Sequence, residues 1–171
     1  MSKHATKLQA EASKFKFVSR EEIERRHFVH HTKRGWGIWL RRYAWAHFVT
    51  LTFARRTGEQ GAIRLFMKWI CELERLTRRE VGWFFVLEWG SGGQLHLHAL
   101  TTGTENLPPA CLEQMWRSGR PLVAAYDKHL GASYYVTKHL GSTILHYDIA
   151  PPEKFIGAVL TDRENEGDSD Q

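Results

Sequence analysis

The stretch QLHLHALTT, residues 94–102, alternates apolar and polar residues and carries two histidines, His96 and His98, separated by a single leucine. Alternation with a period of two is typical of a β-strand whose two faces meet different surroundings. Residues i and i+2 of a strand face the same way. The pattern therefore predicts that both imidazoles leave one face of a sheet, while the neighbouring leucines and alanine leave the other.

A second strand is predicted directly before the first, over VGWFFVLEWG, residues 81–90. It is rich in the aromatic and β-branched residues that strands favour. Gly90, Gly92 and Gly93 predict a tight turn between the two strands, so that they form an antiparallel hairpin. In such a hairpin Glu88 lies beside the start of the next strand, within reach of His96 or His98.

The rest of the chain predicts further strands and helices around this hairpin. Upstream, AHFVTLTFA (46–54) is strand-like, and the apolar residues of 61–79 recur at helical spacing. Ser19 and Glu22 form a capping-box pattern for a short helix over 19–26, whereas 28–45 reads as irregular or as an early strand. Downstream, the sequence predicts a helix over 105–119, a strand over 121–127, a short helix over 131–141 and a last strand over 144–149.

This order of elements indicates an α+β fold. A hairpin stands in the middle, and helices connect the outer strands, so we expect a central antiparallel sheet of about five strands with helices packed mainly on one face. A length of 171 residues is enough for one domain with its own core. We expect that domain to span 19–160, preceded by a flexible basic segment over 1–18 and followed by an acidic, disordered tail over 161–171.

Charge and cysteine content narrow the setting. The tail carries a net charge of −4. Because the whole chain carries +5, the other 160 residues carry a net charge of +9. A basic body on a small domain favours a polyanionic partner, most commonly nucleic acid, although simple solubility would also explain it. Cys71 and Cys111 form no CxxC pair, and no apolar run reaches the length of a membrane span. With no signal peptide apparent, we expect a reducing, cytoplasmic location and no membrane.

His96, His98 and Glu88 together suggest a metal site. Two imidazoles on one face of a strand can bind one divalent ion, and a nearby carboxylate completes an open site for Mg²⁺ or Mn²⁺. The absence of a cysteine from this set argues against a closed structural zinc site. The simpler alternative is a polar outer face of a half-buried strand.

A nucleophile is suggested by YYVTKH, residues 134–139. On a helix, Tyr135 and Lys138 lie three residues apart and share a face. A tyrosine near a metal and a lysine can attack phosphorus and hold a covalent phosphotyrosine link. An amphipathic helix with packed aromatic rings remains the alternative.

Three of these segments together resemble a known family. FVTLTF (48–53), HLH (96–98) and YVTK (135–138) occur in this order, with Glu88 before the histidines. The chain resembles the HUH endonuclease superfamily over about residues 46–142, and most closely the replication initiator (Rep) proteins of rolling-circle plasmids and single-stranded DNA viruses.

The resemblance implies a fold and a mechanism. The sheet would be related to that of RNA-recognition domains, with ferredoxin-like topology. His96 and His98 would bind Mg²⁺ or Mn²⁺, with Glu88 as third ligand. Tyr135 would attack single-stranded DNA to leave a 5′-phosphotyrosine and a free 3′-OH that primes rolling-circle replication, and Lys138 would stand at the family's motif lysine.

The resemblance also leaves alternatives open. Tyr134 directly precedes Tyr135 and would fit the spacing of other branches, although we favour Tyr135. No GxxxxGK[ST] loop occurs, so the viral-type helicase domain is missing, and the chain would use a host helicase, be a plasmid-type initiator or be a trimmed domain. The expected partners are single-stranded DNA at a replication origin, expected to be a hairpin, and a host helicase and polymerase. A transposase or relaxase of the same superfamily, or a non-catalytic RNA-recognition-like binding module, are the rival functions.

Basic and aromatic residues offer candidates for DNA capture. We expect a basic surface from residues outside the three motifs, namely Lys33, Arg34, Arg41, Arg42, Arg55 and Arg56. Trp36, Trp39 and Trp45 could stack unpaired bases, but for each of them packing against the core is the favoured interpretation. Thr50 and Thr52, in the first motif, are interpreted as structural or backbone-positioning residues.

Overall fold

The computed structural model describes residues 19–90, 92–130 and 144–155. The chain divides into two compact units, residues 1–31 and 32–171, and each is described by itself. The segments predicted as a flexible N-terminus (1–18), a short helix (131–141) and an acidic tail (161–171) lie outside the described residues. Within the described ranges, no helix combines the length and the apolar character that crossing a bilayer requires.

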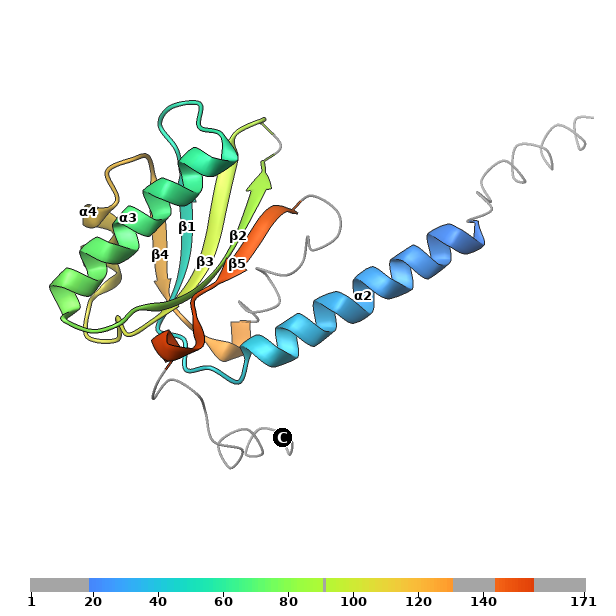
Figure 1. The fold of residues 1–171 in the computed structure, drawn as a ribbon, viewed down its shortest axis with the longest axis horizontal. Coiled ribbons are helices and arrows are strands. Elements are labelled where there is room, and N and C mark those ends of the chain that lie inside the picture. Colours follow the sequence, from blue (N-terminus) through green and yellow to red (C-terminus); the bar gives the residue numbers. More distant parts are fainter. Residues whose placement is uncertain (1–18, 91, 131–143, 156–171) are drawn as a thin grey trace, which may run out of the picture. The chain divides into compact units, whose positions relative to one another are not determined.

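A five-stranded antiparallel sheet forms the centre of the second unit (Figure 1). Its strands lie in the order β4-β1-β3-β2-β5. Their bounds are β1 (His47–Thr52), β2 (Gly82–Trp89), β3 (Leu95–Thr102), β4 (Pro121–Ala125) and β5 (Ile144–Ile149). The first four follow the ferredoxin-like β-α-β-β-α-β path, and β5 is added beside β2. The predicted α+β class, its strand number and its topology are confirmed.

Helix α3 (Glu59–Thr77) covers one face of this sheet (Figure 1). The strands turn their alternate apolar residues toward it, because the side chains of a strand point to opposite faces in turn. The Phe66 ring of α3 meets the rings of Trp83 and Phe85 at centroid distances of 5.7 and 5.1 Å. These residues are buried, together with Leu87, Leu97, Val49 and Leu51 from the same face of the strands.

Helix α4 (Pro109–Met115) is shorter than the helix predicted over 105–119. It begins at a proline, as expected, because the first helical position needs no backbone N–H partner. It ends where Trp116 turns into an extended conformation. The Trp116 indole N–H donates to the carbonyl of Thr52 at 3.1 Å, so a tertiary contact stops the helix.

The prediction for residues 28–45 is wrong. One helix, α2 (Arg20–Leu40), runs through Gly35 and Gly37, although glycine weakens a helix interior. It begins directly after Ser19, where the capping-box pattern placed a helix start. Trp36 and Leu40 stand four residues apart, the spacing of one helix face, but α2 as a whole has little apolar periodicity, so the local pattern gave no helix signal here.

The last turns of α2 and the chain that follows build an aromatic cluster. Trp36 contacts Phe84 and Tyr147, each at a centroid distance of 5.4 Å. Trp45 is buried and donates its indole N–H to the Leu40 carbonyl at 2.7 Å. Packing, the favoured interpretation of these tryptophans, is confirmed for all three, because Trp45 is part of the core and Trp36 and Trp39 are partly buried and packed against it.

Candidate functional site

The β2–β3 hairpin brings Glu88 and His96 together. The two residues are direct partners in the antiparallel register. The turn between them is closed by hydrogen bonds from Gly90 N–H to the Gln94 carbonyl (2.8 Å) and from Gly93 N–H to the Gly90 carbonyl (2.9 Å). Gly93 has a φ of 70°, which glycine adopts without steric cost. The predicted hairpin therefore exists, and its glycines set the register of the two strands.

Glu88 makes its side-chain contact diagonally, with the second histidine. Glu88 Oε1 lies 3.0 Å from His98 Nε2. On the other side of the ring, His98 Nδ1 lies 3.0 Å from the Thr50 hydroxyl, which comes from β1. The side chains of His98 and Glu88 are only 7% and 13% exposed, so this pair is largely withdrawn from water. Three adjacent strands thus contribute one hydrogen-bonded line, Glu88–His98–Thr50.

The Thr50 hydroxyl suits both protonation patterns of His98. A carboxylate accepts, so the bond to Glu88 puts a proton on Nε2, and Nδ1 then accepts from the Thr50 hydroxyl. An ion on Nε2 would move the proton to Nδ1, which would then donate to the same hydroxyl. Such a partner on the outer nitrogen fixes the ring and its tautomer. The contact of Thr50 is thus with a histidine ring, whereas the sequence suggested a structural or backbone-positioning role.

His96 lies on the same face but is not one of the three residues of the hydrogen-bonded line Glu88–His98–Thr50. The centroids of the His96 and His98 rings are 6.3 Å apart. The His96 ring lies against Gly90, where an added Cβ would come within 3.0 Å of Cε1 and Nε2. In the described part of the chain, no three His, Cys, Asp or Glu side chains are already arranged as a metal-ligand group.

Glu88, His96 and His98 form a mixed oxygen and nitrogen donor set. The carboxylate suits Mg²⁺ or Mn²⁺, whereas imidazoles are ligands of borderline divalent ions, so the set fits Mn²⁺ better than Mg²⁺, and three ligands leave positions open. The glycine at position 90 leaves room for the His96 ring. Phe48 stacks in parallel on His98, with a centroid distance of 6.2 Å, and gives the inner side of the site an apolar wall.

The predicted arginines fall at two ends of the sheet. Arg55 and Arg56 follow the end of β1, next to Thr52, whose partner in the register is His96. Arg41 and Arg42 precede the start of the same strand, whose six residues span roughly 20 Å at about 3.4 Å per residue. All four side chains are exposed.

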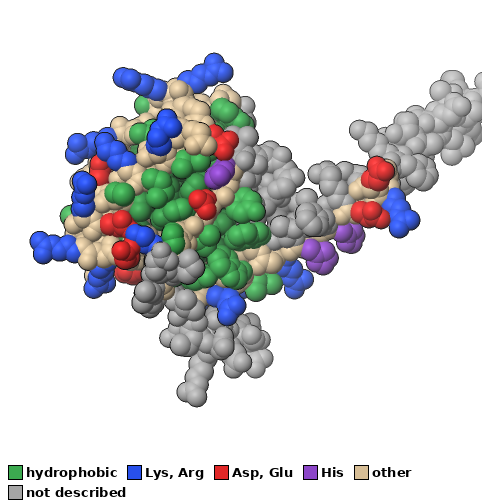
Figure 2. All heavy atoms as spheres, viewed as in Figure 1, with side chains coloured by type: hydrophobic (Ala, Val, Ile, Leu, Met, Phe, Trp, Pro, Cys, Tyr) green, Lys and Arg blue, Asp and Glu red, His purple; other side chains and the backbone are tan. Residues whose placement is uncertain are grey.

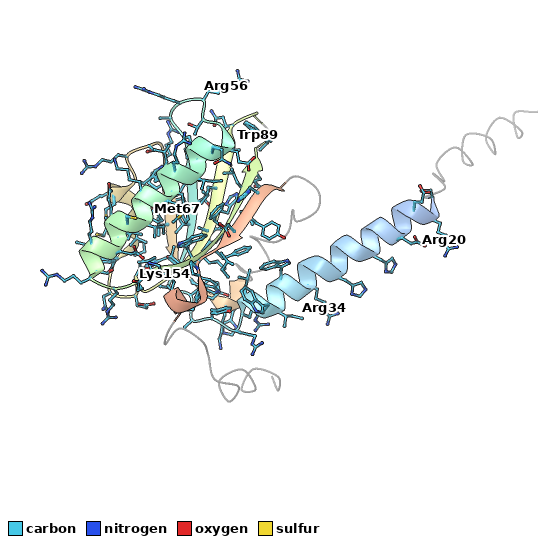
Figure 3. The ribbon with its side chains drawn as sticks, viewed as in Figure 1. Arg20, Arg34, Arg56, Met67, Trp89 and Lys154 are labelled. Carbon is cyan, nitrogen blue, oxygen red and sulfur yellow. The ribbon has the colours of Figure 1, made fainter. Side chains whose placement is uncertain are left out.

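Figures 2 and 3 show where charged side chains lie relative to the sheet. In Figure 3, Arg56 and Trp89 both lie toward the upper end of the sheet, and Lys154 lies toward the lower end. In Figure 2, Lys and Arg side chains line the margins of the view around α3 and the β1–α3 loop, while hydrophobic side chains occupy its middle. Two exposed arginines, Arg55 and Arg56, therefore follow the end of β1 at which Thr52 pairs with His96.

The predicted nucleophile lies outside the described residues. This holds for Tyr135 and Lys138 and for the alternative, Tyr134. The contact between Thr50 and His98 was missed at the level of the sequence. Its signal is the alternation in FVTLT, which places Thr50 on the same face as the histidines once β1 and β3 are known to pair.

Comparison with known proteins gives one match. A model of the ORF2 family of replication-associated proteins matches residues 46–143, which is more than half of the chain. No curated protein and no solved structure matches the chain significantly.

Proposed function

Because this chain belongs to the ORF2 family of replication-associated proteins, we propose that it nicks and rejoins single-stranded DNA to start rolling-circle replication. A role in replication, and with it an interaction with nucleic acid, follows from the family. The observation that carries the enzymatic proposal is the line Glu88–His98–Thr50, because it presents a buried imidazole with a carboxylate at one nitrogen and an orienting hydroxyl at the other. A hydrogen-bonding partner on the outer nitrogen, here the Thr50 hydroxyl on Nδ1, is what a histidine that binds a metal needs to fix its ring.

Glu88, His96 and His98 would hold the cofactor, Mg²⁺ or Mn²⁺. When bound, such an ion supplies positive charge that polarises the scissile phosphate. The chain's own residues would orient the ligands: Thr50 would fix the His98 ring, and the Phe48 ring lies nearly parallel to that ring, with a centroid distance of 6.2 Å. These are the assignments of an HUH-type site.

Tyr135 would supply the nucleophile. Its phenol oxygen forms a bond to the scissile phosphorus, and the bond from that phosphorus to the 3′ oxygen of the preceding nucleotide breaks. The phenol proton is lost, and the departing 3′ oxygen takes up a proton to become a free 3′-OH. Lys138, three residues after Tyr135 in the sequence, would steady the phenolate or a phosphate oxygen.

The partners follow from this activity. The substrate would be single-stranded DNA at a replication origin, presented by a hairpin, in the cytoplasm. The 3′-OH would be extended by a host polymerase, and a host helicase would open the duplex.

The test is a search for the covalent intermediate. Purified protein is mixed with a pool of random single-stranded DNA in Mn²⁺ or in EDTA, and a denaturing gel is examined for protein shifted by attached DNA. We expect a shifted band in Mn²⁺ alone, which Tyr135→Phe abolishes and Tyr134→Phe retains. Sequencing of the attached DNA gives the nick site.

Other outcomes point elsewhere. Loss in Tyr134→Phe instead would move the nucleophile by one residue. Cleavage without any covalent species would indicate a general metal phosphodiesterase. Binding of DNA with neither cleavage nor adduct would favour a non-catalytic binding module, and adducts that join two DNA ends with transposon-like specificity would favour the transposase or relaxase branch.

A further inference from the structure

The loop that joins α4 to β4 is bound tightly to the end of β1. Thr52 N–H donates to the Arg120 carbonyl at 3.0 Å, and Arg120 N–H donates to the Thr52 hydroxyl at 3.1 Å. Ala54 N–H donates to the Ser118 carbonyl at 2.8 Å. The backbone of Arg120 is therefore held by its neighbour strand and does not depend on its own side chain.

Gly119 makes this approach possible. A Cβ at this position would lie 2.1 Å from the Thr52 carbonyl oxygen, a distance that no side chain could occupy. The buried Trp116 ring, bonded to the same carbonyl, holds the other side of the loop. Glycine at 119 thus brings Arg120 against the end of β1 in one defined position.

Arg120 extends the row of the metal-ligand candidates. The register pairs Leu51 with Pro121, so the next pair outward is Thr52 with Arg120, as their backbone hydrogen bond indicates. Thr52 pairs with His96, and His96 pairs with Glu88. By the alternation of a strand, Arg120 therefore belongs to the face on which these residues lie.

The spacing suits a shared ligand. Neighbouring strands lie about 4.8 Å apart, so the backbones of Arg120 and His96 are about 10 Å apart across Thr52. An arginine side chain and a histidine ring pointing from such positions can approach one phosphate group between them. Arg120 is exposed, and it takes part in none of the ion pairs within the described part of the chain.

We propose that Arg120 binds the scissile phosphate of the DNA strand, opposite the Glu88–His98 pair. A guanidinium group offers a planar fork of donors that matches two phosphate oxygens, and it stays charged at every physiological pH. Bound there, Arg120 neutralises charge that develops on the phosphate oxygens during attack. This inference rests on the proposed nicking function.

Arg117 provides a matched control within the same loop. It lies three residues earlier and is also exposed. It lines a small groove of about 130 Å³ with Lys68 and Trp69, between α3 and the end of α4 and so on the helix-covered side of the sheet. A general electrostatic attraction for DNA would use both arginines, whereas a scissile-phosphate contact needs Arg120 alone.

The first measurement is the rate of adduct formation in a single turnover, at saturating protein, on an oligonucleotide that contains the nick site. Arg120→Ala is expected to slow it about 100-fold, the cost of removing one preorganised donor to a developing oxyanion. Arg120→Lys, which keeps the charge but not the fork, is expected to recover part of this loss. Arg117→Ala is expected to stay within about twofold of wild type.

The second measurement is DNA affinity in EDTA, where no cleavage occurs. One oligonucleotide carries the ordinary phosphate at the nick site, and another carries an uncharged methylphosphonate there. Wild type and Arg117→Ala are expected to lose about tenfold or more in affinity on neutralisation, as for one lost hydrogen bond to a charged group. Arg120→Ala is expected to lose less than about twofold, since its contact is already gone.

The outcomes separate the two proposals. If wild type forms the adduct, but wild type and Arg120→Ala lose equal affinity on the methylphosphonate, the role of Arg120 is overturned. The nicking function then stands. No metal-dependent adduct from wild type overturns the nicking function, and the role of Arg120 with it. If Arg120→Ala melts well below wild type, Arg120→Met replaces it in the same cycle, because it keeps the aliphatic part of the side chain.

Discussion

Two histidines on opposite faces of the sheet have nearly the same burial and different surroundings. His47 begins β1 on the α3 side and is 4% exposed, and His98 lies in β3 on the other side and is 5% exposed. In each, Nδ1 is bonded to a threonine hydroxyl, at 2.9 Å to Thr104 for His47 and at 3.0 Å to Thr50 for His98. Burial and a threonine partner therefore do not distinguish a structural histidine from a ligand.

The two histidines differ at the remaining nitrogen. His98 Nε2 faces the carboxylate of Glu88. For His47, burial lowers the pKa of the imidazole below its ordinary value, opposed by the charge of Glu105 and by a hydrogen bond with the Leu107 backbone. One histidine is thus kept neutral to tie the 103–107 segment to the sheet, whereas the other presents a donor beside an acid. A carboxylate in direct contact with the ring, that of Glu88, therefore separates the proposed metal ligand His98 from His47.

The largest expected effect comes from removing each imidazole in turn. His98→Ala should lower the rate of metal-dependent adduct formation by more than about 100-fold, since loss of a ligand's supporting partner alone costs about 10- to 100-fold. His47→Ala should leave the rate near that of wild type, measured at a temperature at which both variants are folded. Similar losses of activity in His98→Ala and His47→Ala would contradict the prediction that adduct formation needs His98 and not His47.

A smaller effect is expected from removing the two hydroxyls. Thr50→Val should reduce Mn²⁺ affinity or activity by about 10- to 100-fold, because His98 loses the partner that fixes its ring. Thr50→Ser, which keeps the hydroxyl, should restore most of it. Titration of activity with Mn²⁺ measures the shift, and full activity in Thr50→Val would show that the ring needs no support from β1.

Thr104→Val is the counterpart on the other face. It should leave nicking unchanged but lower the free energy of unfolding by about 1–3 kcal/mol, since a buried nitrogen of His47 loses its partner. Thermal melting should show this as a decrease of roughly 2–4 °C for each kcal/mol. An activity loss without a stability loss would place His47 in the site and contradict the comparison.

The smallest effect is a dependence of stability on pH. The pKa of His47 is lowered in the folded chain, so the unfolded chain binds the proton more readily. Its contribution to stability is complete above the unfolded value of about 6.5 and is lost as the pH falls below it. The difference in melting temperature between wild type and His47→Gln should therefore shrink from about pH 7.5 to about pH 5. A constant difference would mean that His47 does not titrate in this window.

Much of this architecture could be predicted from local patterns. The alternation in 94–102 and the glycines at 90–93 predicted the hairpin, and β5 has the bounds that the sequence indicated, 144–149. The spacing of apolar residues predicted α3 to within two residues at either end. The local patterns did not predict the helix within 28–45, because glycines beside tryptophans are not typical of a helix. The end of this helix is supported by tertiary contacts such as that of Trp36 with Phe84.

That Glu88 and the two histidines share one face could be known from the sequence alone, because strand periodicity and a short turn are local properties of the chain. Which of them touch became clear only in three dimensions. Glu88 binds His98 although its register partner is His96, because side chains also reach diagonal neighbours across a sheet.

The pairing of β1 with both β3 and β4 likewise added Thr50 and Arg120 to this face. Those two residues lie about 20 to 50 positions from the histidines in the sequence, and strand pairing over such separations depends on the whole buried core rather than on any local pattern.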